Sequence, residues 1–182
     1  MAAIVLLSGS PSPKSRTAAL LNYAAARLKA ADLETVQFGL TDFPAEDLVL
    51  GRYGSPSFEP LTRRVAEAPA LIVCTPIYKA AYSGGLKTVL DMLPQTGLRG
   101  KTVLPLATAG SPAHQLAIDY ALKPVLSALG ATDILQGVYL VETLFKLRED
   151  GSMDIDPELH ERLDRSIDRL AASVKGRSAT SI

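Results

Sequence analysis

The sequence predicts a three-layer α/β sandwich built on a parallel sheet of five strands. Short apolar runs of β type alternate with amphipathic stretches of ten or more residues along most of the 182-residue chain. That alternation is typical of βαβ units, whose strands are parallel. The first run, residues 3–8, is almost entirely apolar, as a central strand must be when helices cover both faces of its sheet.

The remaining elements follow in order along the chain. The apolar runs predict strands at residues 3–8, 34–40, 70–75, 101–107 and 133–141. Apolar residues at helical spacing predict helices at residues 15–30, 59–67, 84–93, 114–129 and 157–174. Residues 41–57 carry prolines and glycines and are expected to form an irregular excursion. We expect residues 1–175 to form one domain and residues 176–182 to be a disordered tail.

Strand order determines where a ligand can bind. Right-handed crossovers leave few topologies, and the flavodoxin-like order 2-1-3-4-5 suits five strands. Ligands of such sheets bind beyond the carboxyl ends of the strands, at the switch point between the first and third strands. The candidate site is therefore formed by the loops that follow Ser8, Thr75 and Ala107.

Composition excludes several classes of partner. Nineteen Lys and Arg balance nineteen Asp and Glu, so the chain lacks the field that attracts nucleic acid and differs from a small acidic electron carrier. One cysteine and two distant histidines predict neither a disulfide framework nor a metal site. No apolar run approaches the roughly 20 residues that span a bilayer, and the N-terminus lacks the basic opening of a secretory signal. We expect no membrane or nucleic-acid partner and a cytoplasmic location.

The first loop has the features of a phosphate site. A helix begins near Ser15, and a helix N-terminus offers free backbone N–H groups and the positive end of its dipole. Ser10, Ser15 and Thr17 add hydroxyl donors, Arg16 adds a full positive charge, and Gly9 allows a sharp turn. These residues together favour a terminal phosphate dianion.

The spacing of residues in this loop differs from that of three common motifs. It lacks the second glycine and the Gly-Lys pair of a nucleotide P-loop, and it lacks the second glycine of a dinucleotide fingerprint. The G-x-S-x-G pattern of a nucleophile elbow is absent from the whole sequence. A capped helix that binds no ligand stays open as an alternative.

The second and third loops have room for a flat ring. Residues 75–87 contain a proline, two tyrosines and a Gly-Gly pair, and residues 108–110 are small. Backbone N–H groups here can stabilise negative charge on a reduced flavin. Tyr78 or Tyr82 can lie along the ring, although packing in the core or at an interface explains each tyrosine equally well. We interpret Cys74, inside a strand, as a buried small hydrophobe.

At these loops the chain resembles the NADPH-dependent FMN reductases, and most of all the reductase component of two-component alkanesulfonate monooxygenase systems. The resemblance rests on Gly9-Ser10-Pro11 with Ser15-Arg16, on TPIYKAAYSG at residues 75–84, and on DYALKPVLSAL at residues 119–129. It covers roughly residues 4–137.

The resemblance implies reduction of FMN by NADPH and delivery of reduced FMN to a flavin-dependent monooxygenase that desulfonates alkanesulfonates. It also implies a homotetramer of paired dimers, with a homodimer as the simpler assembly. The implied phosphate contacts are Ser10, Ser15, Arg16 and Thr17. The implied ring contacts are Pro76, Ile77, Tyr78, Lys79, Ser83, Thr108, Ala109 and Gly110. We name no general acid or base, because hydride transfer between nicotinamide and flavin depends on stacking and electrostatics.

One feature of the helix at residues 114–129 follows from covalent structure alone. Pro124 has no N–H, so the carbonyl of Tyr120 loses its α-helical partner, and a kink or a single π-type turn is expected near Tyr120. In the resembling family, a π-helix that carries this tyrosine lies at the tetramer interface beside the flavin. Tyr120 is therefore a candidate flavin-transfer residue.

Three rival functions stay open. The first is an NAD(P)H-dependent quinone or azo reductase that holds FMN permanently, and the second is a flavodoxin-type electron carrier. The third is a module that binds a phosphorylated ligand other than flavin. The sequence also leaves open the preference between NADPH and NADH, the residues that bind the NADPH 2′-phosphate, and whether FMN is retained or released.

Overall fold

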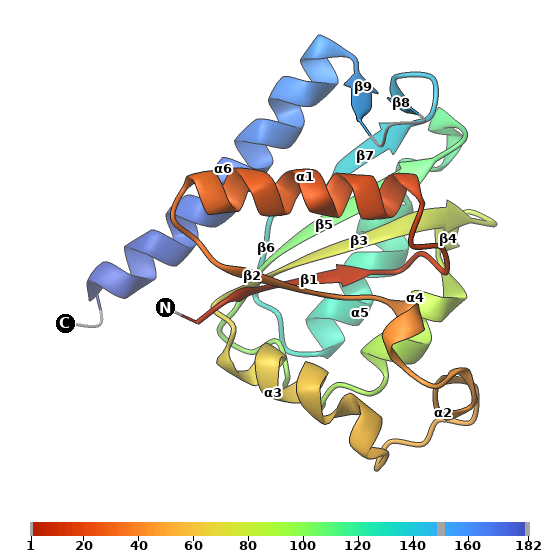
Figure 1. The fold of residues 1–182 in the computed structure, drawn as a ribbon, viewed down its shortest axis with the longest axis vertical. Coiled ribbons are helices and arrows are strands. Elements are labelled where there is room, and N and C mark those ends of the chain that lie inside the picture. Colours follow the sequence, from red (N-terminus) through yellow and green to blue (C-terminus); the bar gives the residue numbers. More distant parts are fainter. Residues whose placement is uncertain (1, 149–151, 181–182) are drawn as a thin grey trace.

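The computed structural model describes residues 2–148 and 152–180, and it has the predicted three layers (Figure 1). Helices α1 (Arg16–Ala30) and α6 (Pro157–Thr180) cover one face of the central sheet. Helices α3 (Glu59–Glu67), α4 (Gly84–Leu90) and α5 (Lys123–Ala128) cover the other. Among the described residues, no helix is both long enough and apolar enough to cross a membrane.

The sheet confirms the predicted topology. Its parallel strands are β1 (Ile4–Ser8), β2 (Thr35–Phe38), β3 (Ala70–Tyr78), β5 (Thr102–Ala109), β6 (Asp133–Ile134) and β7 (Val138–Val141). The order is β2-β1-β3-β5, followed by β6 and β7, which lie one after the other along the same edge of β5; this is the flavodoxin-like 2-1-3-4-5 arrangement. The switch point therefore lies between β1 and β3.

Alternate residues of each buried strand pack on opposite layers. In β1, Leu6 faces the cluster under α1 and α6, while Leu7 faces the cluster under α3, α4 and α5. In β3, Ile72 and Val73 divide in the same way, and all four side chains are inaccessible to solvent. Burial on both faces explains why these strands are apolar throughout instead of alternating with polar residues.

The predicted strand at residues 133–141 is divided in two. Between the paired positions, β5 advances by three residues, from Val103 to Leu106, while its neighbour advances by four, from Ile134 to Val138. One extra residue against the partner strand is the signature of a β-bulge. The single fifth strand that the pattern predicted is thus two short strands joined by a bulge.

Pro105 explains this bulge. The carbonyls of Val103 and Ala109 accept hydrogen bonds from the fifth-strand segment, so the backbone N–H and C=O groups of odd-numbered residues in β5 point toward that segment. The backbone nitrogen of Pro105 points the same way but carries no hydrogen, so the ladder loses a bond at this position. Gly137 closes the bulge: a Cβ there would lie 2.8 Å from Ile118 and 3.0 Å from the Pro105 carbonyl oxygen.

Residues 114–129 do not form the single continuous helix that was predicted, but they contain the irregular turn that was predicted within it. A 3₁₀ turn (Pro112–His114) is followed by a π-helix (Ile118–Leu122) and then by α5. The Lys123 N–H donates to the Ile118 carbonyl, which is the i to i−5 bond of a π-helix. Pro124 comes directly after this bond, so the predicted π-type turn near Tyr120 is confirmed.

Other differences are local. The excursion at residues 41–57 contains a short helix α2 (Ala45–Val49) and is flanked by 3₁₀ turns at Leu40–Asp42 and Pro56–Phe58. An antiparallel pair, β8 (Phe145–Leu147) and β9 (Met153–Ile155), was not predicted. Helix α6 continues past Val174 to Thr180, so the expected tail from Gly176 is helical up to that point, and residues 181–182 lie outside the described residues.

Candidate functional site

The three predicted loops meet at the carboxyl edge of the sheet. Ser83, which precedes α4, is 2% exposed, and its hydroxyl donates to the Gly9 carbonyl at 2.5 Å while accepting the Leu86 N–H at 3.1 Å. The Ser83 N–H donates to Thr75 Oγ1 at 3.0 Å. The first and second loops are therefore fixed to one another by Ser83, which caps α4, and by Thr75, which lies within β3 because that strand continues past its predicted end to Tyr78.

Gly9 sits inside this junction. A Cβ at this position would lie 2.9 Å from Leu86 Cβ, 3.1 Å from Thr75 Oγ1 and 3.2 Å from Ser83 Oγ. Its backbone N–H donates to the Cys74 carbonyl at 2.7 Å, which extends the β1–β3 ladder by one bond. Close packing, and not an unusual backbone angle, makes glycine necessary here.

The start of α1 presents the donors of an anion site. Ser15 is the N-cap, and its Oγ accepts the Ala18 N–H at 3.1 Å. The N–H groups of Arg16 and Thr17 precede that bond at the positive end of the helix. Arg16 Nη1 lies 2.5 Å from Glu142 Oε1, so a carboxylate of the same chain already contacts the guanidinium that is predicted to bind phosphate.

The other two predicted phosphate residues are more enclosed. Thr17 is buried, and its Oγ1 lies 3.2 Å from Thr108 Oγ1, which joins the first loop to the third. Ser10 is 7% exposed, and its Oγ accepts the Ser12 N–H at 3.2 Å, which fixes the turn of the first loop. These hydroxyls shape the loop, and their contact with a ligand remains a prediction.

The second loop is a tight hairpin. Strand β3 turns into β4 (Ala81–Tyr82) with Tyr78 paired to Ala81, so Lys79 and Ala80 alone form the turn. Both have positive φ, 50° and 65°, in the left-handed region that two-residue hairpins require and that asparagine or glycine usually occupies. Strained backbone of this kind gathers at ligand sites.

Exposure divides the predicted ring contacts. Pro76 and Ile77 are half-buried, and Lys79 and its neighbour Tyr78 point outward, with Tyr78 52% exposed. Ser83 is a brace between loops, so the structure gives it a role that the sequence did not predict. These contacts with a flavin ring remain predictions.

The third predicted loop, residues 108–110, begins inside β5, because this strand extends to Ala109 and not only to Ala107. Thr108 and Ala109 are buried, and Gly110 is exposed. Tyr139 supports the loop because its hydroxyl donates to the Ser111 carbonyl at 2.8 Å, and burial raises the pKa of this phenol. Ile77 packs on the small cluster that contains Ala109 and Tyr139, so the second and third loops share one support.

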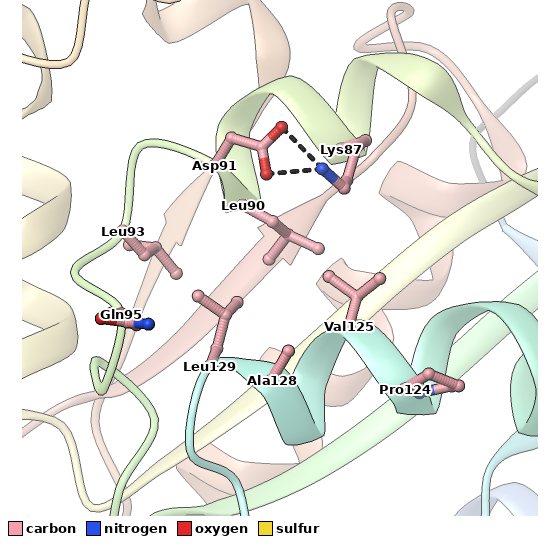
Figure 2. Close-up of a pocket in the computed structure, with 9 residues that line it drawn as sticks. All are labelled: Lys87, Leu90, Asp91, Leu93, Gln95, Pro124, Val125, Ala128 and Leu129. Atoms are coloured by element: carbon pink, nitrogen blue, oxygen red, sulfur yellow. Dashed lines mark hydrogen bonds and ion pairs between the residues drawn. The ribbon is translucent and has the colours of Figure 1, made fainter.

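Tyr120, on the π-helix, is 78% exposed and has an exposed apolar neighbour, Leu116. Beside this helix lies a groove of about 470 Å³ between α4 and α5, lined mainly by apolar side chains (Figure 2). The Lys87–Asp91 ion pair borders it at 2.6 Å. None of the predicted FMN contacts lines this groove, which is formed by α4, the segment that follows it and α5, and not by strand ends.

Acid–base and metal groups are sparse at the site. Cys74 is fully buried, and burial raises the pKa of its thiol, in agreement with its interpretation as a small hydrophobe. Within residues 2–148 and 152–180, no group of three or more histidine, cysteine and acidic side chains is arranged to hold a metal ion.

Comparison with known proteins explains this arrangement. Residues 2–145 match the family model described as NADPH-dependent FMN reductase. The chain belongs to the NADPH-dependent FMN reductase family. It is 47% identical over 173 residues to the FMN reductase (NADPH) of Escherichia coli K12, covering 91% of this chain and 86% of that protein. Pseudomonas putida KT2440 has an FMN reductase (NADPH) that is 45% identical over 96% of this chain and 89% of its own.

A solved structure agrees with this membership. The apo form of the NADH:FMN oxidoreductase EMOB superposes with a TM-score of 0.85 at 39% identity, over 95% of this chain and 90% of that one. An archaeal flavodoxin, at 14% identity and a TM-score of 0.60, shares the fold. The chain is therefore an NADPH-dependent FMN reductase that uses FMN and NADPH, as the sequence resemblance implied.

Two residues that contact the candidate site were not predicted from the sequence. Glu142 lies just beyond β7, where the predicted fifth strand had already ended, and only the sheet order places it beside Arg16. Thr75 was identified only as the end of a strand, yet its Oγ1 accepts the Ser83 N–H. A polar residue directly after, or near the carboxyl end of, an apolar strand was the available signal for both.

Proposed function

We propose that FMN binds with its phosphate at the start of α1 and its ring between the second and third loops, where it accepts hydride from NADPH. The observation that carries this proposal is the three-way junction at the sheet edge. Ser83 ties the second loop to Gly9, and Thr17 ties the third loop to the first. A junction made before binding reduces the entropy lost when a ligand is held.

The donor set fits a phosphate dianion. Arg16 offers a planar guanidinium, Ser15 offers a hydroxyl, and the first turn of α1 offers N–H groups. The carboxylate of Glu142 at Arg16 shows that the guanidinium already accommodates an oxyanion. When bound, FMN supplies the ring that accepts the hydride.

The chain's own groups would then position the flavin ring and enclose it. The Tyr78–Ala81 hairpin holds backbone N–H groups in a fixed turn beside the ring. Buried Thr108 and Ala109 close the site from the side of β5. No side chain need transfer a proton for hydride transfer, which agrees with the absence of an assigned acid or base.

We also propose that reduced FMN passes to a flavin-dependent monooxygenase that desulfonates alkanesulfonates, in the cytoplasm. The support is the sequence resemblance to reductase components of such systems. The exposed side chains of Tyr120 and Leu116 favour self-association into a homodimer or homotetramer. Light scattering of the purified protein measures that assembly.

One assay tests the core of this proposal. Consumption of NADPH is followed at 340 nm without flavin, with added FMN and with added riboflavin, for the wild type and for Arg16→Gln. The expected result is FMN-dependent turnover in the wild type and a rise in KM for FMN, but not for riboflavin, in Arg16→Gln. Arg165→Gln is the matched control, because Arg165 forms an exposed ion pair on α6. Equal KM values for FMN in wild type and Arg16→Gln refute the phosphate assignment.

The colour and kinetics of the same purified protein distinguish the rival reductase functions. A quinone or azo reductase would be purified yellow and would reduce quinones by ping-pong kinetics. A relative from Staphylococcus aureus named FMN-dependent NADPH-azoreductase is 27% identical over 93% of this chain. The assay therefore includes quinones and azo compounds as substrates. Colourless protein that requires added FMN supports the proposal, and permanently yellow protein contradicts it.

Transfer to a partner has its own readout. Tyr120→Ala is expected to retain FMN more tightly or to lose the NADPH oxidation that depends on free FMN. Sulfite release from an alkanesulfonate, with the monooxygenase supplied, measures delivery. Unchanged kinetics and unchanged flavin retention in Tyr120→Ala contradict a role for this residue in transfer.

A further inference from the structure

The ion pair between Arg16 and Glu142 joins the two ends of the candidate site. Arg16 is the first residue of α1, and Glu142 follows the last residue of β7. Their side chains meet at 2.5 Å, with 35% and 54% of their surfaces exposed. The Glu142 N–H donates to the Ala109 carbonyl at 2.8 Å, so the sheet fixes the backbone that carries this carboxylate.

The surroundings of this pair are otherwise basic. It borders a pocket of about 510 Å³ whose polar lining includes Lys14, Ser15 and Lys146, and Glu142 is the one carboxylate that the described part of the chain contributes to that lining. Its second oxygen faces Gly110: a Cβ added to that glycine would lie 3.6 Å from Glu142 Oε2. The acid thus stands between the first loop and the third, among groups that attract anions.

We propose that the Glu142 carboxylate competes with the FMN phosphate for Arg16 and so weakens FMN binding. The inference rests on the proposed phosphate site and names the residue that sets its affinity. A carboxylate and a phosphate use the same fork of a guanidinium, so an arriving phosphate must displace Glu142 or share Arg16 with it. Either outcome places two anions near one cation and costs part of the attraction.

Such a competitor suits an enzyme whose flavin is a substrate. Reduced FMN must leave before the next turnover can deliver another molecule. A carboxylate that recaptures Arg16 as the phosphate departs lowers the barrier to release, because the guanidinium is never left without an anion. Glu142 is in this view an affinity-determining residue that acts through Arg16, not a catalytic residue.

The expected effect is modest because the pair is partly exposed. Exposed ion pairs contribute little, so removing the competitor should tighten FMN binding by about twofold to fivefold at low salt. Screening of charges at this distance should reduce the effect in about 0.5 M salt. Riboflavin has no phosphate, so its affinity should not change.

The test measures Kd by quenching of flavin fluorescence, with FMN and riboflavin, for the wild type and Glu142→Gln. The amide keeps the shape of the side chain and removes its charge, and Glu142→Ala gives a second variant. Glu161→Gln is the matched control, since Glu161 pairs with Arg165 on α6 in an ion pair that is also exposed. The prediction is a lower Kd and slower release of FMN in Glu142→Gln, no change with riboflavin, and no change in the control.

Two further variants separate this inference from the proposal on which it rests. Arg16→Gln should weaken FMN binding, and adding Glu142→Gln to it should restore nothing, because the contested guanidinium is gone. If Arg16→Gln weakens FMN binding but Glu142→Gln leaves it unchanged or weakens it, the competition is refuted and the phosphate site stands. If Arg16→Gln has no effect on FMN binding, the phosphate site itself is wrong.

Discussion

Replacing Gly9 by alanine tests whether the junction of the loops is as tight as its distances indicate. The added Cβ would lie 2.9 Å from Leu86 Cβ, and real Cβ atoms essentially never approach so closely. Leu86 Cβ is fixed to the backbone of α4 and cannot rotate away, while Thr75 Oγ1 and Ser83 Oγ, at 3.1 and 3.2 Å, are held by hydrogen bonds. The start of α4 must therefore move away from β1.

The cost of such overpacking is about 1–3 kcal/mol of unfolding free energy. For a chain of this length each kcal/mol corresponds to about 2–4 °C in Tm, so a fall of roughly 2–12 °C is expected. The same movement separates the first and second loops, so the Kd for FMN should rise.

Thermal unfolding and FMN titration of Gly9→Ala measure both effects. Gly54→Ala is the control, because nothing lies within 4 Å of a Cβ at that position and its φ is not in the left-handed region. A Gly9→Ala protein with the Tm and the FMN affinity of the wild type would refute the reasoning.

Three further predictions concern stability. Hydrogen bonds from Ser55, and then from Arg52 and Ser57, hold the pKa of Asp47 below its usual value of 3.8. The wild type should therefore be more stable than Asp47→Asn above pH 3.8. This advantage should disappear as the pH falls through the lower pKa of the folded state. Measuring Tm for both proteins from pH 7 to pH 2.5 checks this, and a constant difference contradicts it. Tyr23 of α1 donates to Asp164 of α6 at 2.5 Å, and burial and that contact raise the pKa of its phenol to about 12; Tyr23→Phe should lose about 1–2 kcal/mol in urea unfolding, whereas unchanged stability would show that the bond contributes nothing. Ala80 has a φ of 65°, so Ala80→Gly should gain about 0.5–1 kcal/mol, with Ala81→Gly, in β4, as a control that should lose stability.

Features determined by the local chain were predictable from the sequence. Apolar runs identified the central strands because these strands are buried on both faces. The π-helix was predictable because the missing N–H of Pro124 is a covalent fact that no tertiary contact can change. The consecutive residues Ser15, Arg16 and Thr17 at the start of α1 could be proposed as phosphate contacts because a local run of donors is visible in the sequence.

Features that depend on which residues face one another were not predictable in this way. The bulge in the fifth strand arises because Pro105, on β5, points toward that strand, which requires the sheet register. The contact of Arg16 with Glu142 requires the strand order, which brings the end of β7 beside the start of α1. The small sheet of β8 and β9 has strands of only three residues each, too short for periodicity to reveal.

A crystal structure of the protein with FMN bound tests the proposed site most directly. We expect the phosphate at the N-terminus of α1, within hydrogen-bonding distance of Ser15 and Arg16, and the ring against the Tyr78–Ala81 hairpin and Gly110. A phosphate bound elsewhere, such as in the groove between α4 and α5, with Arg16 still paired only to Glu142, would contradict the proposed mode of binding.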